Sequence, residues 1–320
     1  MFERIIPLLE NAEKVGIFAH ENPDGDALGS SYSLKLVFQS LGKQAEVYLS
    51  AKPDQQAFEI VKGKSNTGLK AEDCDLLVAV DCAAPERLGE YKELFLNHKN
   101  TVAIDHHITH VHYAKEAVVE GCSSCCELMY RLYGEMGCTI SPEIAHNVYL
   151  GMVCDTGRFQ FPDVTPNTLR VAAELMEQGA DFSDISKKIF DTKTRGYYAL
   201  MQTALNRLLY FEDGRVCALY LGMDDFEAAG IDEAGAAGIV TMPSSIDGVE
   251  VGIYIREREK GSYKVSLRSP KTVDVSAVAV ALGGGGHVRA SGYGVAGKSL
   301  PEMLDEVLAE IKKQLKEDRG

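Results

Sequence analysis

The amino-acid sequence predicts an α/β protein, with an N-terminal, mainly parallel sheet covered by helices and a second, smaller α+β domain across a cleft. Three observations lead to this fold class. The chain has 320 residues, enough for two domains of ordinary size. In its first half, apolar runs alternate with amphipathic helical stretches, which is typical of β-α-β units. From Gly214 onward, apolar and polar residues alternate within the strand-like runs, which indicates a different kind of sheet.

Four apolar runs in the first half are predicted to be buried strands. They are Val15–His20, Ala45–Leu49, Asp75–Asp81 and Thr101–Asp105. Because these runs are apolar throughout, rather than at alternate positions, we expect helices to cover both faces of their sheet.

Helical periodicity occurs between and after these strands, over residues 27–41 and 123–137. Ser141-Pro142-Glu143 then supplies an N-cap, a proline in the first turn and an early acid. A helix is therefore predicted from Ser141 towards Asp155, and Thr165-Pro166 repeats the start signal for the next helix.

The second domain is predicted to contain strands at Arg215–Leu221, Val249–Ile255 and Tyr263–Arg268, with a hairpin turn at Lys260-Gly261. Its last helix begins at a capping box, Ser299–Glu302. The apolar stripe of that helix consists of Leu300, Met303, Leu304, Val307, Leu308, Ile311 and Leu315. We place the two domains at residues 1–190 and 214–320, joined by a connecting segment, 191–213, that contains a helix over 195–211.

The charge balance narrows the class of partner. The formal net charge is −14, which argues against binding along duplex nucleic acid through broad basic surface. A short anionic substrate remains compatible, because a few cations or metals can invert the field inside one site. No apolar run approaches the roughly 20 residues needed to span a bilayer, and the N-terminus lacks a signal-peptide pattern, so we expect a cytoplasmic protein.

The eight cysteines do not form a disulfide framework in a chain of this length. Cys122-Ser-Ser-Cys125, followed by Cys126, is a single C-x-x-C pattern, whereas a structural zinc site normally needs a second pair of ligands. We interpret these cysteines as small buried residues near the start of a helix, in preference to a metal or redox site.

Side chains typical of metal ligands occur at the ends of the predicted strands and helices: His20, Asp24, Asp26, Asp81, His106 and Asp155. The carboxyl ends of parallel strands meet at one edge of a sheet, where ligands bind. Taken singly, such residues are turn formers or helix caps. Together, imidazole and carboxylate groups crowded at one edge predict two divalent ions of the manganese, iron or zinc type.

A run of four glycines, Gly283, Gly284, Gly285 and Gly286, precedes His287 and Arg289. Taken alone, a glycine run indicates a flexible turn. Here it lies between a helix-like and a strand-like segment, so we expect its backbone amides, with the two side chains and Arg268, to bind phosphate. Arg158 is a further candidate contact.

These motifs resemble those of the DHH phosphoesterase superfamily. The resemblance rests on His20-Glu-Asn-Pro-Asp-Gly-Asp-Ala27, Asp81, Asp105-His106-His107 and Gly151-Met-Val-Cys-Asp-Thr-Gly157. The segment Gly283–Gly292 resembles the substrate-binding motif of the DHH-associated domain. Within the superfamily, the chain is most similar to the stand-alone oligoribonucleases (nanoRNases) and 3′-phosphoadenosine 5′-phosphate (pAp) phosphatases.

The resemblance implies a role for each residue. His20, Asp24 and Asp81 would hold one ion, and the other would be held by Asp26, Asp81, His106 and Asp155. His107 would face the scissile phosphate, and Asp105 would orient the histidines. Two positions depart from the family pattern: Cys125 replaces a threonine, and Ser291, counted with the substrate-binding residues, replaces an alanine.

The resemblance therefore implies a hydrolase with two divalent ions, most simply Mn²⁺. Its substrates would be short single-stranded RNA, cleaved to nucleoside 5′-monophosphates, and pAp, cleaved to AMP and phosphate. Phosphodiesterase action on the linear dinucleotide pApA or on cyclic di-AMP is the alternative within this class. A manganese pyrophosphatase and a non-catalytic nucleotide-binding regulator are weaker alternatives, because the glycine segment and all proposed metal ligands are present.

Overall fold

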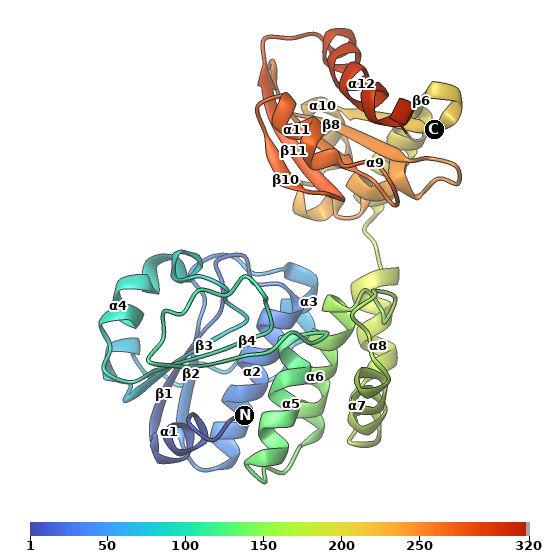
Figure 1. Cartoon of the computed structure of the whole chain (residues 1–320). Coiled ribbons are helices and arrows are strands. Elements are labelled where there is room, and N and C mark those ends of the chain that lie inside the picture. The colour runs from blue at the N-terminus through green and yellow to red at the C-terminus, as the bar shows by residue number, and fades with distance from the viewer. Residues whose placement is uncertain (318–320) are drawn as a thin grey trace. The chain divides into compact units, whose positions relative to one another are not determined.

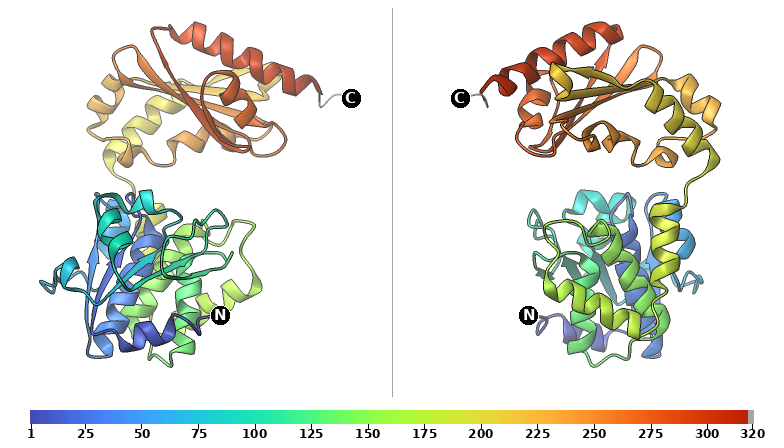
Figure 2. Two further views of the ribbon diagram at one scale, coloured as in Figure 1. Left: turned by 60° about the vertical axis from the view of Figure 1, so that its left-hand side comes forward. Right: turned by 90° about the vertical axis from the view of Figure 1, so that its right-hand side faces the viewer.

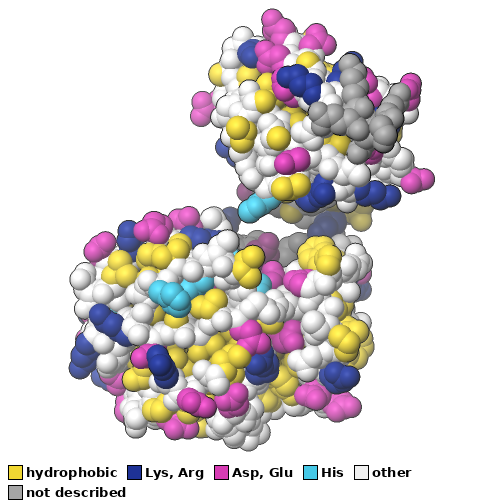
Figure 3. Space-filling model, in the orientation of Figure 1, with side chains coloured by type: hydrophobic (Ala, Val, Ile, Leu, Met, Phe, Trp, Pro, Cys, Tyr) yellow, Lys and Arg dark blue, Asp and Glu magenta, His cyan; other side chains and the backbone are white. Residues whose placement is uncertain are grey.

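The structure, a computed structural model, describes residues 1–317 and divides into two compact units, Met1–Thr192 and Lys193 onward (Figure 1). Within the described residues, no helix is long and apolar enough to cross a membrane. Acidic and basic side chains are interspersed over the surface shown in Figure 3, so the net negative charge is not gathered into one patch there.

The first unit is built on a parallel sheet in the order β2-β1-β3-β4-β5. The strands are β1 Lys14–Phe18, β2 Gln44–Tyr48, β3 Leu76–Val80, β4 Thr101–Asp105 and β5 Glu116–Val119. The first four confirm the predicted strands. β5 was not predicted from the sequence, because this four-residue edge strand is only partly buried and therefore lacks an apolar run.

Helices cover both faces of this sheet, as its apolar strands predicted. They are α1 Ile6–Asn11, α2 Gly25–Ser40, α3 Gln55–Ile60, α4 Lys92–Asn97, α5 Cys125–Glu135, α6 Pro142–Asp155, α7 Pro166–Glu177 and α8 Phe182–Ser186. The main core joins one face of the sheet to α2, α5 and α6, which lie side by side in Figure 1. A smaller cluster, which includes Phe18, Leu77 and Phe95 of α4, covers the other face.

The predicted start signals of these helices are present as hydrogen bonds. The Ser141 hydroxyl accepts from the Ile144 amide at the start of α6, and Thr165 forms a reciprocal cap with Thr168 at the start of α7. α2 is buried along most of its length, so its position is fixed tightly against the sheet and α6.

The second unit contains a mixed six-stranded sheet in the order β10-β11-β9-β8-β7-β6, in which only β7 and β8 pair in parallel. Its strands are β6 Leu209–Phe211, β7 Val216–Leu221, β8 Val251–Glu259, β9 Ser262–Arg268, β10 Gly285–His287 and β11 Ala290–Ala296. Its helices are α9 Arg195–Asn206, α10 Met223–Ala229, α11 Val275–Ala281 and α12 Leu300–Glu317. α11 and α12 pack on one face of the sheet (Figure 2), and α9 packs on the other.

Two sequence expectations change here. The segment 195–211 is not one helix: α9 ends at Asn206, and Leu209–Phe211 form β6, which pairs with β7. Short apolar runs fit either state, and here a partner strand distant in sequence decides it. The second change concerns the glycine run, because Gly285 and Gly286 belong to β10.

Candidate metal centre and active site

The candidate side chains of the first unit lie where its parallel strands end. His20 comes shortly after β1, Asp81 directly follows β3, and His106 and His107 follow Asp105, the last residue of β4. Because β1, β3 and β4 are parallel neighbours, these ends lie at one edge of the sheet.

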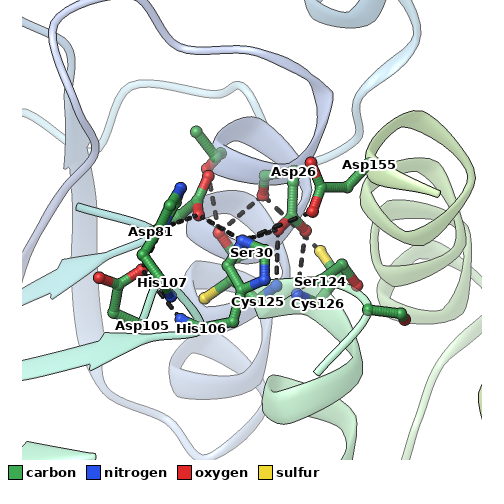
Figure 4. Close-up of polar contacts among 12 residues, drawn as sticks. Asp26, Ser30, Asp81, Asp105, His106, His107, Ser124, Cys125, Cys126 and Asp155 are labelled. Carbon is green, nitrogen blue, oxygen red and sulfur yellow. Dashed lines mark hydrogen bonds and ion pairs between the residues drawn. The ribbon is translucent and has the colours of Figure 1, made fainter. Parts of the chain in front are cut away.

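Two helices bring the remaining carboxylates to the same edge. Asp24 is the N-cap of α2, and its side chain accepts hydrogen bonds from the amides of Asp26 and Ala27. Asp26 lies in the first turn of α2, and Asp155 is the last residue of α6. In Figure 4 the carboxylates of Asp26, Asp81 and Asp155 point towards one another.

One group of potential ligands surrounds His20. Its Nε2 atom lies 3.8 Å from Asp24 Oδ2 and 3.7 Å from Asp81 Oδ2. His20 and Asp81 are buried, whereas Asp24 reaches the surface. These separations are longer than hydrogen bonds. Metal-ligand atoms that surround a shared cation are separated in the same way.

A second group surrounds His106, whose Nε2 atom lies 3.4 Å from Asp81 Oδ1, 3.4 Å from Asp155 Oδ2 and 3.9 Å from Asp26 Oδ2. The Nδ1 atom of His106 is 3.1 Å from the carbonyl oxygen of Cys122 and donates to it. That bond directs the Nε2 atom towards the three carboxylates. Asp81 is common to both groups.

The backbone of Asp81 is strained. Its φ of 52° lies in the left-handed region, which non-glycine residues rarely adopt. Its Oδ1 atom is buried and has no hydrogen-bond partner in the described part of the chain. Each feature costs about 1–3 kcal/mol, and such costs are characteristic of functional sites. A divalent cation would satisfy the oxygen, so the donor set fits a metal at this position.

The burial and crowding of these groups also shift their pKa values. Burial and then repulsion from Asp81 raise the pKa of Asp26 to about 7, and burial and then Asp26 raise the pKa of Asp155 to about 7. Burial disfavours the charged form of His106, but Asp81 and Asp26 outweigh it and raise the His106 pKa to about 10. Divalent ions between the carboxylates would offset the burial and the repulsion that raise the pKa values of Asp26 and Asp155.

The start of α5 holds Asp26 in place. Its carboxylate accepts hydrogen bonds from the amides of Cys125, at 2.6 Å, and Cys126, at 2.9 Å. Both thiols are buried, which raises their pKa well above the usual range. The interpretation of the cysteines as small buried residues at a helix start holds for Cys125 and Cys126, whereas Cys122 precedes α5 and is only partly buried. Cys125 and Cys126 contribute backbone amides to the site.

Asp105 connects two histidines. Its Oδ1 atom accepts from His107 Nδ1 and its Oδ2 atom from His110 Nδ1, both at 2.7 Å. Although burial opposes it, these two histidines hold the pKa of Asp105 well below its usual range. Because a carboxylate only accepts, His107 donates through Nδ1 and its Nε2 atom is left for another group.

His110 was not among the site residues predicted from the sequence. Its side chain is 2% exposed, and its ring stacks on Tyr113 with 5.3 Å between ring centroids. The Tyr113 hydroxyl in turn donates to the carbonyl oxygen of Cys82, beside Asp81. A third histidine within five residues of Asp105 was the available signal, but only the structure shows which histidine contacts the carboxylate.

In the second unit, the glycine run is more ordered than expected. The amides of Gly283 and Gly284 donate to the carbonyl oxygens of Val280 and Ala279 at the end of α11. The expectation that all four amides are free to bind phosphate is therefore wrong for these two. Gly286 has a φ of 138°, and a side chain there would clash with the backbone of Ser291, so this position of β10 requires glycine.

The other candidate contacts separate into two sets. His287 and Arg268 align through Ala290 in the strand register, so they lie on one face of the sheet. Arg289 is exposed in the β10–β11 turn and donates to the carbonyl oxygen of Val273. Ser291 is buried on the opposite face, where its hydroxyl donates to Val275, so the structure does not bring it together with the first set.

Arg158, in the first unit, is already paired. It forms an ion pair with Asp191, donates to the carbonyl oxygen of Ser186, and lies over the ring of Phe190. Its φ of 63° is strained, but its guanidinium is engaged within the unit.

Within the described residues, three groups of side chains place potential metal-ligand atoms within 4.8 Å of one another. They are His20–Asp24–Asp81, Asp26–His106–Asp155 and Asp81–His106–His107. The first two groups correspond to the ligand sets that the sequence resemblance implied, except that Asp81 lies with His106 and His107 rather than in the group of Asp26.

Comparisons with known proteins agree with this fold. Residues 14–152 match the DHH family, N-terminal domain, and residues 213–317 match the DHHA1 domain. An exopolyphosphatase-related protein from Bacteroides fragilis has a similar structure, with a TM-score of 0.86 and 25% identity, over 98% of this chain and 95% of that one. Fold and matches together define a phosphoesterase with DHH and DHHA1 domains.

Sequence relatives narrow the class. The bifunctional oligoribonuclease and PAP phosphatase NrnA of Thermus thermophilus is 33% identical over 93% of this chain and 89% of that protein. The protein of the same name from Bacillus subtilis is 24% identical over 99% of both chains. The chain belongs to the DHH phosphoesterase family, in the group of these NrnA proteins. RecJ of Thermus thermophilus in complex with Mn²⁺ shares the fold, with a TM-score of 0.56 and 15% identity, over 98% of this chain and 55% of RecJ.

Proposed function

We propose that the protein hydrolyses short oligoribonucleotides to nucleoside 5′-monophosphates, and pAp to AMP and phosphate, with two divalent ions, preferably Mn²⁺. The observation that carries the proposal is Asp81: a strained, buried carboxylate whose Oδ1 atom accepts no hydrogen bond from the described residues, and which is shared by two groups of ligand atoms. The names of the relatives supply the substrate class.

The first unit would carry the chemistry. His20, Asp24 and Asp81 would hold one ion; Asp26, Asp81, His106 and Asp155 would hold the other. When bound, the ions would supply Lewis-acid stabilisation of the charge that develops on the phosphoryl oxygens. The backbone amides of α5 fix Asp26, so this ligand is positioned before any ion binds.

His107 would contact the scissile phosphate. Its Nδ1–H is committed to Asp105, so its orientation is set by a buried carboxylate that His110 holds from the other side. A fixed donor aimed at developing charge lowers a barrier because it needs no reorganisation during the reaction.

The second unit would bind the part of the substrate remote from the reacting phosphate. His287 and Arg268 share one face of its sheet, and Arg289 lies in the adjoining turn. Arginine is suited to paired contacts with phosphate oxygens. Binding energy gained there would position the scissile phosphate and so raise the rate as well as the affinity.

A turnover panel tests the proposal. The full chain, stripped with a chelator and reloaded with Mn²⁺ or Mg²⁺, would be assayed on pAp, di- to decanucleotides, pApA, cyclic di-AMP and pyrophosphate. We expect metal-dependent turnover of pAp and of the short oligonucleotides. Turnover of only cyclic di-AMP or pyrophosphate, or activity that resists chelation, would overturn it.

A further inference from the structure

The start of α5 orients two candidate metal ligands through its main chain. The first two amides of the helix donate to the carboxylate of Asp26, at 2.6 and 2.9 Å (Figure 4). Just before the helix, the carbonyl oxygen of Cys122 accepts from the Nδ1 atom of His106, at 3.1 Å. Asp26 and His106 belong to one group of potential ligands, with Asp155. The conformation of residues 122–126 therefore determines how two members of this group are directed.

Glu127 follows this segment, and its carboxylate has no part in the site described so far. The side chain lies in the interior, and Glu127 is 4% exposed. Its Oε2 atom accepts hydrogen bonds from the hydroxyl of Ser123, inside the segment, and from the hydroxyl of Thr168, at 2.9 Å. Its Oε1 atom accepts from the side-chain amide of Asn167, at 3.0 Å. A buried carboxylate is costly unless it is hydrogen-bonded, so these donors hold Glu127 in one place.

These bonds connect the segment to the first turn of α7. Thr168 is itself part of the cap of that helix, where its hydroxyl accepts from the Thr165 amide at 3.1 Å. Because a hydroxyl has one proton, that of Thr168 is left to be donated to Glu127. The main chain of Glu127 is fixed as well, since its amide donates to the Ser124 hydroxyl at 3.0 Å. Glu127 thus joins two helix starts, one of which holds Asp26.

We propose that Glu127 is a positioning residue for the ion that Asp26 and His106 would hold. Its carboxylate would fix residues 122–126 against α7, so that their amides and carbonyl oxygen face the two ligands before an ion binds. Ligands that are already oriented raise metal affinity, because less conformational freedom is lost on binding. The inference rests on the proposed function and concerns only this one of its two ions.

The other ion should depend less on Glu127. The Nδ1 atom of His20 accepts from the amide of Asn22, at 3.3 Å, and Asp24 is held as the N-cap of α2. Neither contact involves residues 122–127. Removal of the Glu127 carboxylate should therefore weaken the binding of the two ions unequally.

Mn²⁺ binding to the full chain tests this role apart from activity. The protein would be stripped with a chelator and titrated calorimetrically with Mn²⁺, as wild type, Glu127→Ala, Glu127→Gln and Ser123→Ala. Asp24→Asn, which removes a ligand of the other ion, would identify the two binding steps. Melting temperatures show which variants fold, and if Glu127→Ala does not fold, the two milder variants carry the test.

Tyr130→Phe is the matched control. Tyr130 also joins α5 to α7, since its hydroxyl donates to Glu174 at 2.9 Å and accepts from Gln178 at 3.1 Å. It lies further along α5, outside the segment that holds Asp26. Tyr130→Phe should therefore leave the affinity for both ions unchanged.

In Glu127→Ala, the Kd of one Mn²⁺ should rise about tenfold, as is usual when a residue behind a metal ligand is lost, and the other Kd should change much less. The affected step should be the one that Asp24→Asn leaves intact. Glu127→Gln, which keeps the shape and one acceptor oxygen, and Ser123→Ala, which removes one bond, should weaken the same ion by a smaller factor. Excess Mn²⁺ should restore most of the pAp turnover of these variants, because they lose affinity for an ion and no catalytic group.

Equal weakening of both ions, or a loss in Tyr130→Phe as large as in Glu127→Ala, would show that Glu127 only packs α5 against α7 and would overturn the inference. Unchanged Mn²⁺ affinities in folded Glu127→Gln and Ser123→Ala would overturn it too. These results leave the proposed function intact as long as the wild type binds two Mn²⁺ and hydrolyses pAp or short oligonucleotides. A wild type that binds a single Mn²⁺, or hydrolyses none of these substrates, would refute the proposed function instead.

Discussion

The two units present opposite charges to a ligand, and they arrange them differently. In the first unit, Asp26, Asp81 and Asp155 crowd at one edge of a parallel sheet, at positions where strands and helices end. In the second, Lys264 and Arg268 lie along the face of a mixed sheet, within a strand. The first arrangement suits cations, and the second suits the phosphates of a substrate.

The comparison shows what each architecture contributes. Ends of parallel strands converge, so short sequence motifs can assemble a compact cluster whose members are close to one another. The face of a sheet instead spreads its side chains at the spacing of strand residues, which suits an extended ligand. Chemistry would therefore be concentrated at one point in the first unit, while recognition would extend over several ångströms in the second.

The largest expected effect comes from Asp81, because it is shared by both ligand groups. Asp81→Asn should lower turnover of every substrate at least about a hundredfold, more than is usual for loss of a residue that only supports a metal ligand. Bound Mn²⁺, measured by elemental analysis, should fall as well. Asp163→Asn removes an exposed carboxylate of the same unit and serves as the control. Near-normal turnover by Asp81→Asn would contradict the two-ion site.

Substitution of the two adjacent histidines, His106 and His107, should have different effects on bound metal. His106→Ala removes a nitrogen that faces three carboxylates, so it should lose metal as well as rate. His107→Ala should retain metal and lose rate, because its Nδ1 atom is bound to Asp105. Elemental analysis and kcat for the two variants decide between these roles. The reverse pattern would exchange the assignments.

Substitution of His110 tests whether the rate depends on the orientation of Asp105, and through it of His107. His110→Ala removes one of the two histidines that hold Asp105, and we expect kcat to fall about ten- to a hundredfold with little change in KM or metal content. His110→Asn keeps a donor and should recover part of the rate. Thr109→Ala, at the adjacent exposed position, is the control. Equal losses for His110→Asn and His110→Ala, or a loss of metal, would indicate a structural role only.

In the second unit, His287→Ala and Arg289→Ala should weaken substrate binding. A charged contact to phosphate contributes on the order of 1.5–3 kcal/mol, so kcat/KM for dinucleotides and pAp should fall about ten- to a hundredfold. A small activated aryl phosphodiester, which needs only the first unit, should be much less affected. If both kinds of substrate lost rate equally, these residues would support the fold or the metals instead.

The contrast between the units also explains what could be predicted from sequence. The strands before His20, Asp81 and His106 are long apolar runs, so their ends, and the ligands there, could be located. β6 could not be located, because pairing with β7 decides between helix and strand. That Lys264 and Arg256 share one face of the second sheet depends on the β8–β9 register, which includes an irregularity near Glu257 that no local pattern shows.

His110 and the glycine run fail for a related reason. His110 contacts the Asp105 carboxylate because of the conformation of the loop after β4. The spacing of the two residues in the sequence does not determine this contact. The glycine run was interpreted as an open loop, but Gly283 and Gly284 end α11 while Gly285 and Gly286 pair with β11. Glycine permits both a left-handed helix end and close strand approach, so its presence does not distinguish between them.

The smallest expected effect on activity concerns a carboxylate of the first unit that already has its cation. Glu46 is buried, and its side chain accepts hydrogen bonds from Lys35 Nζ, at 2.6 Å, and from Thr67. Although burial opposes the charge, Lys35 and Thr67 lower the pKa of Glu46, whereas the pKa of Asp26 is raised. A group with a lowered folded-state pKa stabilises the fold above its unfolded pKa, and this contribution is lost as pH falls through the folded value. The difference in unfolding free energy between wild type and Glu46→Gln should therefore shrink, by an amount on the order of 1 kcal/mol, between pH 6 and pH 3. Denaturant unfolding of both proteins across that range measures it, with turnover of pAp at neutral pH expected to change little. A difference that stayed constant or grew as the pH fell would show that Glu46 does not owe its stabilising effect to its charge.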